Sequence, residues 1–425
     1  MHVAEKTPMT DGEGYWPFTV STEVSKLVSV AAWVCALALA LSHAAQAQAF
    51  TVLHTLSGGG DGADPLAGLT LDRAGNLYGT AYAGGINAPA GTVFKLVHAG
   101  SGWLLNPLYE FSGAGGDGAN PAAGVLFGPD GSLYGTTFNG GSGFGTVYKL
   151  QPPLSACKTA FCYWTETVLY RFASAPDGHQ PAGNVSFDQA GNIYGTTEAG
   201  GSAGYGTVFK LTRSGSHWTE QVLYSFMGGQ DGTTPSDGVV IDRAGNLYGT
   251  TPYGGIDACQ GGCGTVFELT PSGSGWTEQV LYRFQGSPDG QRPYAGLLLD
   301  PSGNLFGATY EGGNAGGGTI FELSRAGGSW NYSVLFNLSG SENGPYASLT
   351  RDSAGNLYDT TIIPSTIFKL SPSGGGWSYT DLHDFSGNDG IYPRGSVTLD
   401  SQGSLYGTAS MGGGDAQGTI WEFAP

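Results

Sequence analysis

The segment Asp242-Arg243-Ala244-Gly245-Asn246-Leu247-Tyr248-Gly249-Thr250-Thr251 decides the fold. It predicts a β-hairpin, in which Gly245 takes the positive φ that a tight turn requires. An Asp at the start of such a turn accepts hydrogen bonds from the turn's N–H groups. Versions of the segment occur seven times, with the aromatic residue that corresponds to Tyr248 at positions 78, 134, 194, 248, 306, 358 and 406. A repeat of about 50 residues is typical of a β-propeller blade.

Each repeat contains four strand-like runs, here called strands A to D. In the fourth repeat these runs are residues 238–242, 246–251, 264–269 and 276–284. Their large aromatic residues recur at strand spacing, so we expect them to pack between neighbouring blades. In the fourth repeat these residues are Tyr248, Phe267, Trp276 and Phe284.

The two ends of the chain do not coincide with the ends of a repeat. The segment Phe50–Leu56 resembles a strand D, whereas the last repeat stops after strand C, at Phe423. We therefore predict an all-β fold over residues 50–425, a single seven-bladed β-propeller of four-stranded blades. Its ring is closed by the N-terminal strand D, which pairs with the C-terminal strands A to C.

The composition limits the classes of function. Of the 425 residues, 75 are Gly and 12% are charged, and the formal net charge is -18. Binding of nucleic acid is disfavoured, because phosphate contacts need clustered Lys and Arg. Many of the acidic residues recur at fixed repeat positions, so part of the charge is a multiplied turn motif.

Residues 1–49 are predicted to be an N-terminal extension and signal peptide. The uncharged run Leu27–Leu41 follows Lys26, and the small residues of 44–49 fit a cleavage site. The run has 15 residues, fewer than the roughly 20 of a membrane span. An uncleaved anchor is the alternative, and Met9 is a second possible start. We expect a secreted or periplasmic protein with no membrane span in the mature chain, monomeric in solution.

Four cysteines follow the signal segment and form two local pairs. Cys157 lies close to Cys162, and Cys259 lies close to Cys263, each pair in a loop insertion. No His stands beside them, and the pairs belong to different repeats, which disfavours a zinc site. We predict two disulfides that staple loops in an oxidising compartment.

The repeated motifs resemble the Gloeo/Verruco (GloVer) tandem repeat of exported bacterial proteins. The motifs that carry this resemblance are Leu247-Tyr248-Gly249-Thr250-Thr251 and Gly264-Thr265-Val266-Phe267 with their counterparts, from Phe50 to Phe423. The resemblance implies export and tandem β-repeats, and it supplies no catalytic residues and no cofactor. The sixth repeat departs from the pattern, with Asp359 in place of Gly and 362–365 in place of the Gly-rich loop.

In a four-stranded blade the D–A and B–C loops share one face, which is the default binding face of a propeller. The Gly-Gly-x-Asp-Gly series of the D–A loops supplies Asp61, Asp117, Asp177, Asp231, Asp289 and Asp389. Loops that differ between repeats supply Glu198, Asp257 and Glu311. The Asp series could bind cations, or each Asp could shape its own turn; equivalent positions around a ring are too far apart to share one ion.

No catalytic group stands out in the sequence. The leading hypothesis is a non-enzymatic binding module whose ligand, a glycan or an extracellular protein, lies on the loop face. A carbohydrate-active hydrolase or lyase is the alternative, because carboxylate pairs can come from different blades. A structural protein of the cell envelope is the third interpretation.

Overall fold

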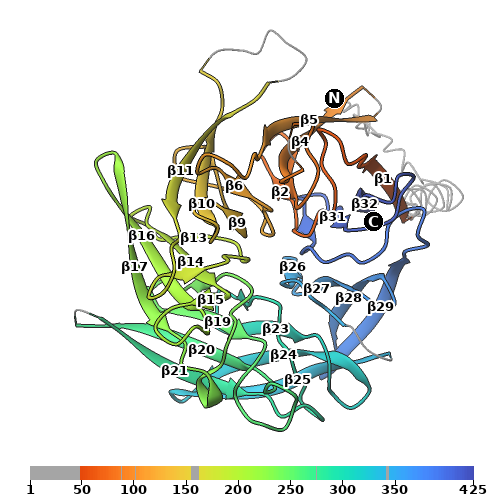
Figure 1. Ribbon diagram of the computed structural model, residues 1–425. Coiled ribbons are helices and arrows are strands. Elements are labelled where there is room, and N and C mark those ends of the chain that lie inside the picture. The colour runs from red at the N-terminus through yellow and green to blue at the C-terminus, as the bar shows by residue number, and fades with distance from the viewer. Residues whose placement is uncertain (1–47, 88, 101, 155–161, 274, 341–343) are drawn as a thin grey trace, which may run out of the picture. The chain divides into compact units, whose positions relative to one another are not determined.

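The computed structural model describes residues 48–425 except 88, 101, 155–161, 274 and 341–343. Ala49–Ala424 form one compact unit. Seven four-stranded antiparallel sheets of this unit stand around a ring (Figure 1). The prediction of a seven-bladed β-propeller is therefore confirmed. The predicted signal segment lies outside the described residues.

The blades are numbered here by the order of their A strands. Blade 1 contains β2 (Thr70–Leu71), β3 (Leu77–Ala81), β4 (Thr92–Ala99) and β5 (Gly102–Glu110). Blade 2 contains β7 (Leu126–Phe127), β8 (Leu133–Thr137), β10 (Thr146–Gln151) and β11 (Thr165–Arg171). Blade 3 contains β13 (Ser186–Phe187), β14 (Ile193–Thr197), β16 (Thr207–Ser214) and β17 (His217–Ser225). Blade 4 contains β18 (Val240–Ile241), β19 (Leu247–Thr251), β20 (Thr265–Ser272) and β21 (Gly275–Arg283).

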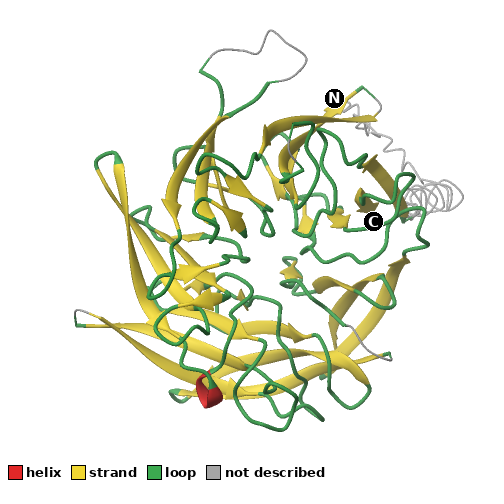
Figure 2. Cartoon of the chain, in the orientation of Figure 1, coloured by secondary structure: helices red, strands yellow, loops and turns green. Residues whose placement is uncertain are grey.

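The remaining three blades follow in order. Blade 5 contains β22 (Leu298–Leu299), β23 (Leu305–Thr309), β24 (Gly316–Ala326) and β25 (Ser329–Ser339). Blade 6 contains β26 (Thr350–Arg351), β27 (Leu357–Thr361), β28 (Thr366–Ser373) and β29 (Gly376–Asp384). Blade 7 contains β30 (Thr398–Leu399), β31 (Leu405–Ala409), β32 (Thr419–Ala424) and β1 (Ala49–Thr55). Figure 2 shows that loops and strands make up almost all of the described chain, with one short 3-10 helix, η1 (Gly229–Asp231).

Ring closure takes place in blade 7. Strand β1 pairs antiparallel with β32, from Ala49 opposite Ala424 to Thr55 opposite Thr419. The two strands lie side by side at the red and blue ends of the colour scale (Figure 1). Blade 7 also contacts blade 1, because the Thr408 hydroxyl donates to the Ala67 carbonyl oxygen at 2.9 Å. The predicted pairing of the first strand with the last three is thus confirmed.

The hairpin that opens each repeat is held by its Asp. In blade 4, Asp242 Oδ1 accepts from the backbone N–H groups of Ala244 (2.8 Å) and Asn246 (2.9 Å). Its Oδ2 accepts from the Asn246 side chain (2.9 Å) and from the Tyr248 hydroxyl (3.1 Å). Gly245 has φ 88°, as the turn requires. The Asp side chain therefore stabilises the turn that connects strands A and B of the blade.

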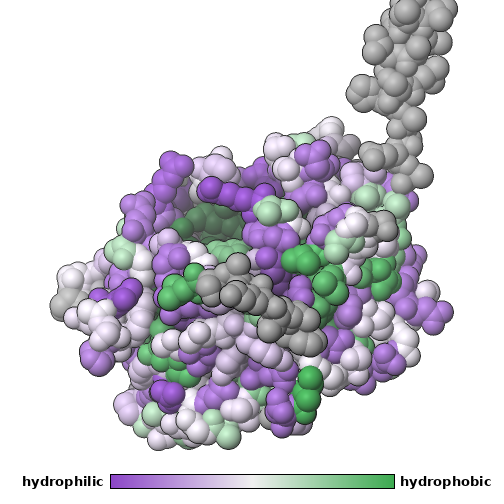
Figure 3. Space-filling model, turned by 90° about the horizontal axis from the view of Figure 1, so that it is seen from above, coloured by the Kyte–Doolittle hydropathy of each residue, from purple (hydrophilic) through white to green (hydrophobic). Residues whose placement is uncertain are grey.

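The core lies between consecutive blades. One cluster joins Tyr248 and Phe284 of blade 4 to Phe321 of blade 5, and another joins Tyr194 of blade 3 to Phe267 and Trp276 of blade 4. The expected packing of the repeat aromatics between blades is confirmed. Seen from above relative to Figure 1, the surface mixes hydrophilic and hydrophobic residues (Figure 3). Among the described residues, no helix has the length and apolar character needed to cross a membrane.

The A strands are shorter than the sequence predicts. The expected strand 238–242 is reduced to β18, Val240–Ile241. Chain segments crowd at the ring centre: a Cβ added to Gly238 would lie 2.0 Å from the Asn184 carbonyl oxygen. The innermost residues of the A segments therefore contact neighbouring blades and do not extend the hydrogen-bonded pairing of strand A with strand B.

The D–A and B–C loops pair with each other, as the prediction of a shared loop face requires. In blade 2 the D–A loop pairs with the B–C loop through β6 (Gly118–Ala119) and β9 (Asn139–Gly140). In blade 3 the same pairing joins β12 (Gly178–His179) to β15 (Ala199–Gly200). Single bridges such as Gln291–Glu311 make the equivalent contact in other blades. The two sets of loops therefore share one face.

Candidate functional site

A cavity of about 310 Å³ opens where the D–A loops reach the centre of the ring. Each of these loops contains a Pro shortly before strand A, at positions 65, 121, 181, 235, 293, 345 and 393. The residue after this Pro lines the cavity in every blade. The seven residues, from blade 1 to blade 7, are Leu66, Ala122, Ala182, Ser236, Tyr294, Tyr346 and Arg394. The series changes from mostly small side chains in blades 1–4 to large ones in blades 5–7. The large side chains form one wall, and the small ones leave the space that this wall faces.

The residue before each of these prolines has an unusual backbone conformation. Six of the seven are non-Gly residues with φ between 54° and 62°: Asp64, Asn120, Gln180, Thr234, Arg292 and Tyr392. Such conformations are sparsely populated and persist only where the surrounding structure holds them. They are held by hydrogen bonds here; the Gln180 carbonyl oxygen, for example, accepts from the Glu198 N–H at 3.1 Å. This bond ties a D–A loop to the B–C loop that carries Glu198.

Tyrosines form the wall in blades 5 and 6. The rings of Tyr294 and Tyr346 stack with centroids 4.7 Å apart. Tyr310 meets both rings edge-on, at 5.4 Å and 5.8 Å. Burial raises the pKa of Tyr346 to about 12, and the charge of Glu198 contributes to this rise. The phenol is therefore neutral at physiological pH, so its hydroxyl retains the proton that it needs to donate a hydrogen bond to a ligand.

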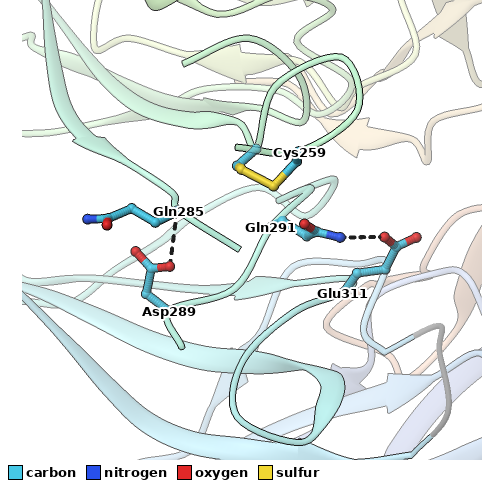
Figure 4. The surroundings of a disulfide bond; sticks show 6 residues. Cys259, Gln285, Asp289, Gln291 and Glu311 are labelled. Atoms are coloured by element: carbon cyan, nitrogen blue, oxygen red, sulfur yellow. Dashed lines mark hydrogen bonds between the residues drawn. A yellow bond between two sulfur atoms is a disulfide. The ribbon is translucent and has the colours of Figure 1, made fainter. Parts of the chain in front are cut away.

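An ion pair supports this wall from behind. Arg292 Nη1 lies 2.7 Å from Glu311 Oε1, and Gln291 Nε2 donates to Glu311 Oε2 at 2.8 Å. Figure 4 shows that Gln291 and Glu311 lie near the Cys259–Cys263 disulfide. The predicted site residue Glu311 is thus engaged by two neighbours, and it holds the residue that precedes the Pro of blade 5.

Glu198 is the predicted site residue that lines the cavity. It follows β14 of blade 3, whereas the tyrosine wall belongs to blades 5 and 6. Burial raises the pKa of its carboxyl to about 7. A carboxyl with this pKa can carry or accept a proton near neutral pH. The prediction from the sequence rested only on its having no equivalent in the other repeats.

Two further polar residues of the cavity join blades to one another. Asp237 Oδ2 accepts from the Gly296 N–H (2.9 Å) and from the Ser348 hydroxyl (2.8 Å), so it connects blades 4, 5 and 6. Asn184 Oδ1 accepts from the Gly124 N–H at 3.0 Å and connects blades 2 and 3. These bonds fix the geometry of the ring around the cavity.

The Asp series of the D–A loops does not converge on one point. Each carboxylate binds donors of its own loop and strand D: Asp61, for instance, accepts from the Ser57 N–H (2.9 Å) and lies 3.1 Å from His54 Nε2. The Asp389 carboxylate likewise accepts from the Ser386 N–H and lies 3.0 Å from His383 Nε2. The other members, which accept equivalent bonds, are Asp117, Asp177, Asp231 and Asp289. This arrangement favours the interpretation that each Asp shapes its own turn.

The remaining predicted residues lie in or near loop insertions. Asp257 is exposed, in the loop closed by the Cys259–Cys263 disulfide, whose Cα atoms are 5.1 Å apart. That predicted disulfide is confirmed. The predicted Cys157–Cys162 pair stays a prediction, because Cys157 lies outside the described residues. Within the described part of the chain, no group of three His, Cys, Asp or Glu side chains is placed to hold a metal ion.

Sequence reasoning missed Tyr294, Tyr346 and Arg394. Their positions carry a usable signal: they occupy one column of the repeat alignment, directly after the D–A loop Pro, and this column varies in size and charge. The sequence could not show that this column faces the cavity, because the direction of these side chains depends on the positive-φ backbone conformation before the Pro.

The fold and site define a seven-bladed β-propeller with an asymmetric cavity at the centre of its loop face. Matches to the model of the Gloeobacter/Verrucomicrobia repeat cover residues 41–255, 163–362 and 221–421. The chain therefore belongs to this repeat family, as its motifs indicated. No curated protein matches the sequence.

Solved structures resemble the chain in fold. Virginiamycin B lyase from Staphylococcus aureus matches with a TM-score of 0.54 and 14% identity, over 89% of this chain and 99% of that one. A candidate 6-phosphogluconolactonase from Bacteroides uniformis matches with a TM-score of 0.47 and 14% identity, over 75% and 84% of the two chains. A candidate glucose dehydrogenase-type oxidoreductase from Thermus thermophilus gives 0.41 and 17%, over 70% and 95%. At these identities the likeness concerns the fold alone.

Proposed function

We propose that this protein is a binding module that holds a saccharide in the cavity at the centre of its loop face. The observation that carries the proposal is the asymmetric series after the seven D–A prolines. Small residues such as Ala122 and Ala182 leave space, whereas Tyr294 and Tyr346 supply a rigid wall. The volume of about 310 Å³ falls at the lower end of the range of small-molecule sites.

The lining has the mixed chemistry that a sugar ring needs. A saccharide presents C–H groups on its faces and hydroxyl groups around its rim. Tyr82, Phe138 and the tyrosine wall offer aromatic carbon, and Ser236, Glu198 and Arg394 offer polar atoms. Tyrosines bind with little loss of conformational freedom because they are large and rigid. The fixed ring of blades keeps this surface preorganised, which lowers the entropic cost of binding.

A cavity-filling substitution tests the proposal. Ala182→Tyr places in blade 3 the side chain that blade 5 carries at the equivalent position, and we expect it to abolish saturable retention on a glycan array. Arg243→Gln, at an A–B turn, is the matched control and should bind as the unchanged protein does. Failure of the unchanged protein to retain any glycan, or unaltered retention by Ala182→Tyr, would refute the proposal.

One observation favours a second candidate function, the cleavage of a glycan by a hydrolase or lyase reaction. Burial raises the pKa of the Glu198 carboxyl to about 7, which suits a general acid or base. If the protein acts on its glycan, new reducing or unsaturated ends should accumulate with time, and Glu198→Gln should stop their formation. Retention without any product supports the binding module.

A further inference from the structure

Arg394 differs from Arg171, Arg283 and Arg292 of the loop face, because each of those three makes a hydrogen bond or an ion pair within the described structure. Arg292 pairs with Glu311 at 2.7 Å, and Arg283 Nε donates to the Gln230 carbonyl oxygen at 2.9 Å. The guanidinium of Arg394 lies over the Tyr346 ring, 5.6 Å from its centroid. Among the described residues it makes no ion pair within 4.0 Å and no hydrogen bond. The residue is exposed, so water can reach the guanidinium.

The absence of a partner is notable because the chain carries a net charge of -18. Asp64 is a carboxylate close enough to respond to this guanidinium. Burial raises the pKa of Asp64, and the Arg394 charge opposes that rise. No direct ion pair forms between them within the described structure. The stack on Tyr346 therefore holds a cation at the edge of the cavity with its N–H groups available.

Glu198 is, like Arg394, a charge-bearing residue of the cavity whose side chain has no hydrogen-bonding or ion-pair partner within the described residues. Its backbone N–H is bonded to Gln180, whereas its carboxyl makes no hydrogen bond or ion pair within the described residues. It acts on the same ring as Arg394, because the charges of both shift the pKa of Tyr346 in opposite directions. The other titratable group that responds to it is Tyr82.

We propose that the saccharide bound in this cavity is acidic, and that its anionic group is held between the Arg394 guanidinium and the protonated Glu198 carboxyl. This inference rests on the proposed function and names the class of saccharide. A carboxylate or a sulfate accepts charge-assisted hydrogen bonds from a guanidinium, often two in parallel. A protonated carboxyl adds an O–H···O⁻ bond, the shortest kind in proteins.

Such a pair of donors makes binding depend on pH. When Glu198 is protonated it donates to the anion, and when it is ionised it repels the anion across the same cavity. Asp64 adds negative charge on the side of Arg394 once it ionises. Tyr82 and Tyr346 stay neutral in the working range, since burial raises both pKa values. Affinity for an acidic saccharide should therefore fall as pH rises through 7.

Calorimetric titration with matched ligands tests the inference. The probes are trigalacturonate, its methyl-esterified form, which has the same rings without the charge, and a sulfated galactose oligosaccharide. We expect one or both anionic probes to bind at least 10-fold more tightly than the ester at pH 5.5, and this advantage to shrink at pH 8. The sulfated probe distinguishes a sulfate from a carboxylate as the preferred group.

Two variants separate the contributions of the donors. Arg394→Gln should lose about 10-fold or more of the affinity for the anionic probe, a clearly larger loss than for the ester, which has no charge for the guanidinium to bind. Glu198→Gln keeps a donor that cannot ionise, so it should flatten the pH dependence. Arg243→Gln, which also removes one positive charge from the chain, is the control and should change neither. Equal melting temperatures would show that the variants are folded.

The outcomes distinguish this inference from the function on which it rests. Equal binding of the ester and both anionic probes, with no effect of Arg394→Gln, overturns the inference and leaves saccharide binding intact. Failure of every saccharide, on the array and in titration, overturns both.

Discussion

Asp359 is the single residue at which the repeat contradicts its own packing rule. The other blades have Gly there, because strand C covers the position with a large ring: a Cβ on Gly249 would lie 2.5 Å from Phe267 Cζ. Asp359 is fully buried, and its Oδ1 accepts from the Thr360 N–H at 2.8 Å, whereas its Oδ2 has no partner within the described structure. A buried carboxyl in this state costs folding free energy.

We predict that Asp359→Gly stabilises the protein. Removal of the unsatisfied carboxyl should raise the free energy of unfolding by about 1–3 kcal/mol at pH 7, after the smaller entropic cost of a strand Gly. Burial raises the pKa of Asp359 well above its usual value, so the folded state retains a proton that the unfolded chain releases. The advantage of the variant should therefore grow as pH rises above about 4.

Thermal unfolding between pH 4 and pH 8 measures this effect. Gly307→Asp is the reciprocal variant and should be strongly destabilised, because a Cβ there would lie 2.4 Å from Phe321 Cζ. A melting temperature of Asp359→Gly below that of the unchanged protein at pH 7 would contradict the account.

The cavity shows which site residues can be predicted from their departure from a repeat pattern. Glu198 could be selected because it departs from its repeat, and the structure places it in the lining. Asp257 and Glu311 departed in the same way, yet one is exposed and the other supports Arg292. Departure from a repeat therefore marks special residues without saying where they point, since side-chain direction depends on the backbone of each loop.

At the scale of single elements, the Asp hairpin is the unit that the sequence specifies most completely. Asp242 receives four hydrogen bonds within one turn. Although burial alone would raise its pKa, the bonds from Asn246 and Tyr248 lower it. Asp242→Ala should reduce the free energy of unfolding by about 2 kcal/mol at pH 7.

The pH dependence of this loss follows from the lowered pKa. The carboxylate stabilises the folded state fully above the unfolded pKa of about 3.9, and this contribution disappears as pH falls through the folded pKa. Denaturant unfolding of Asp242→Ala and the unchanged protein should therefore converge in strong acid. Asp257→Ala, in an exposed loop, serves as the control and should match the unchanged protein; a similar loss there would show that the effect is not specific to the hairpin.

The D strands meet their neighbours in two different ways. In blades 5, 6 and 7 an aromatic ring stacks on the preceding blade, as Tyr332 does on Tyr282 at 3.8 Å. In blades 2, 3 and 4 the same position holds Glu166, Glu220 and Glu278. Burial raises the pKa of each to about 7, and a neighbouring Asp of the preceding D–A loop adds to the rise.

We predict that these three glutamates weaken the ring as they ionise. Their folded pKa values exceed the unfolded value of about 4.3, so stability should fall as pH rises from about 4.5 through 7. The combined change of all three to Gln should remove this slope and stabilise the protein at pH 8, by about 1 kcal/mol per site after allowance for solvent screening. Melting temperatures at pH 5 and pH 8 measure the difference. The paired change Asp257→Asn and Asp415→Asn, at exposed carboxylates, is the control; an equal gain there would rule out the interpretation.

For the whole molecule, the sequence predicts the ring because its strongest signal is periodic. Seven copies of one hairpin determine the number of blades, and the offset between Phe50 and Phe423 determines the closure. The cavity is not periodic. It arises from the differences among Ala182, Tyr346 and their equivalents, together with a positive-φ conformation before the Pro that this chain places on residue types as different as Asp64 and Tyr392.

Closure makes the first strand essential to the last blade. Strand β1 covers β32, and its Phe50 stacks on His383 of blade 6 with centroids 3.7 Å apart. Without it, the edge of β32 and the side chain of Trp421, now fully buried, would lose their cover. We predict that a chain starting at Ser57 melts at least about 10 °C below one starting at Ala49, or does not fold.

Relocation of the strand separates closure from mere loss of residues. In blades 1 and 3–6 a short turn connects strand C to strand D, as between β20 and β21. A chain that starts at Ser57 and carries residues 49–56 after Ala424, joined by a turn of that kind, should regain most of the lost melting temperature, because β1 can then pair with β32 as the other D strands pair with their C strands. An unchanged melting temperature in the truncated chain, or no recovery in the relocated one, would show that the ring does not depend on this strand.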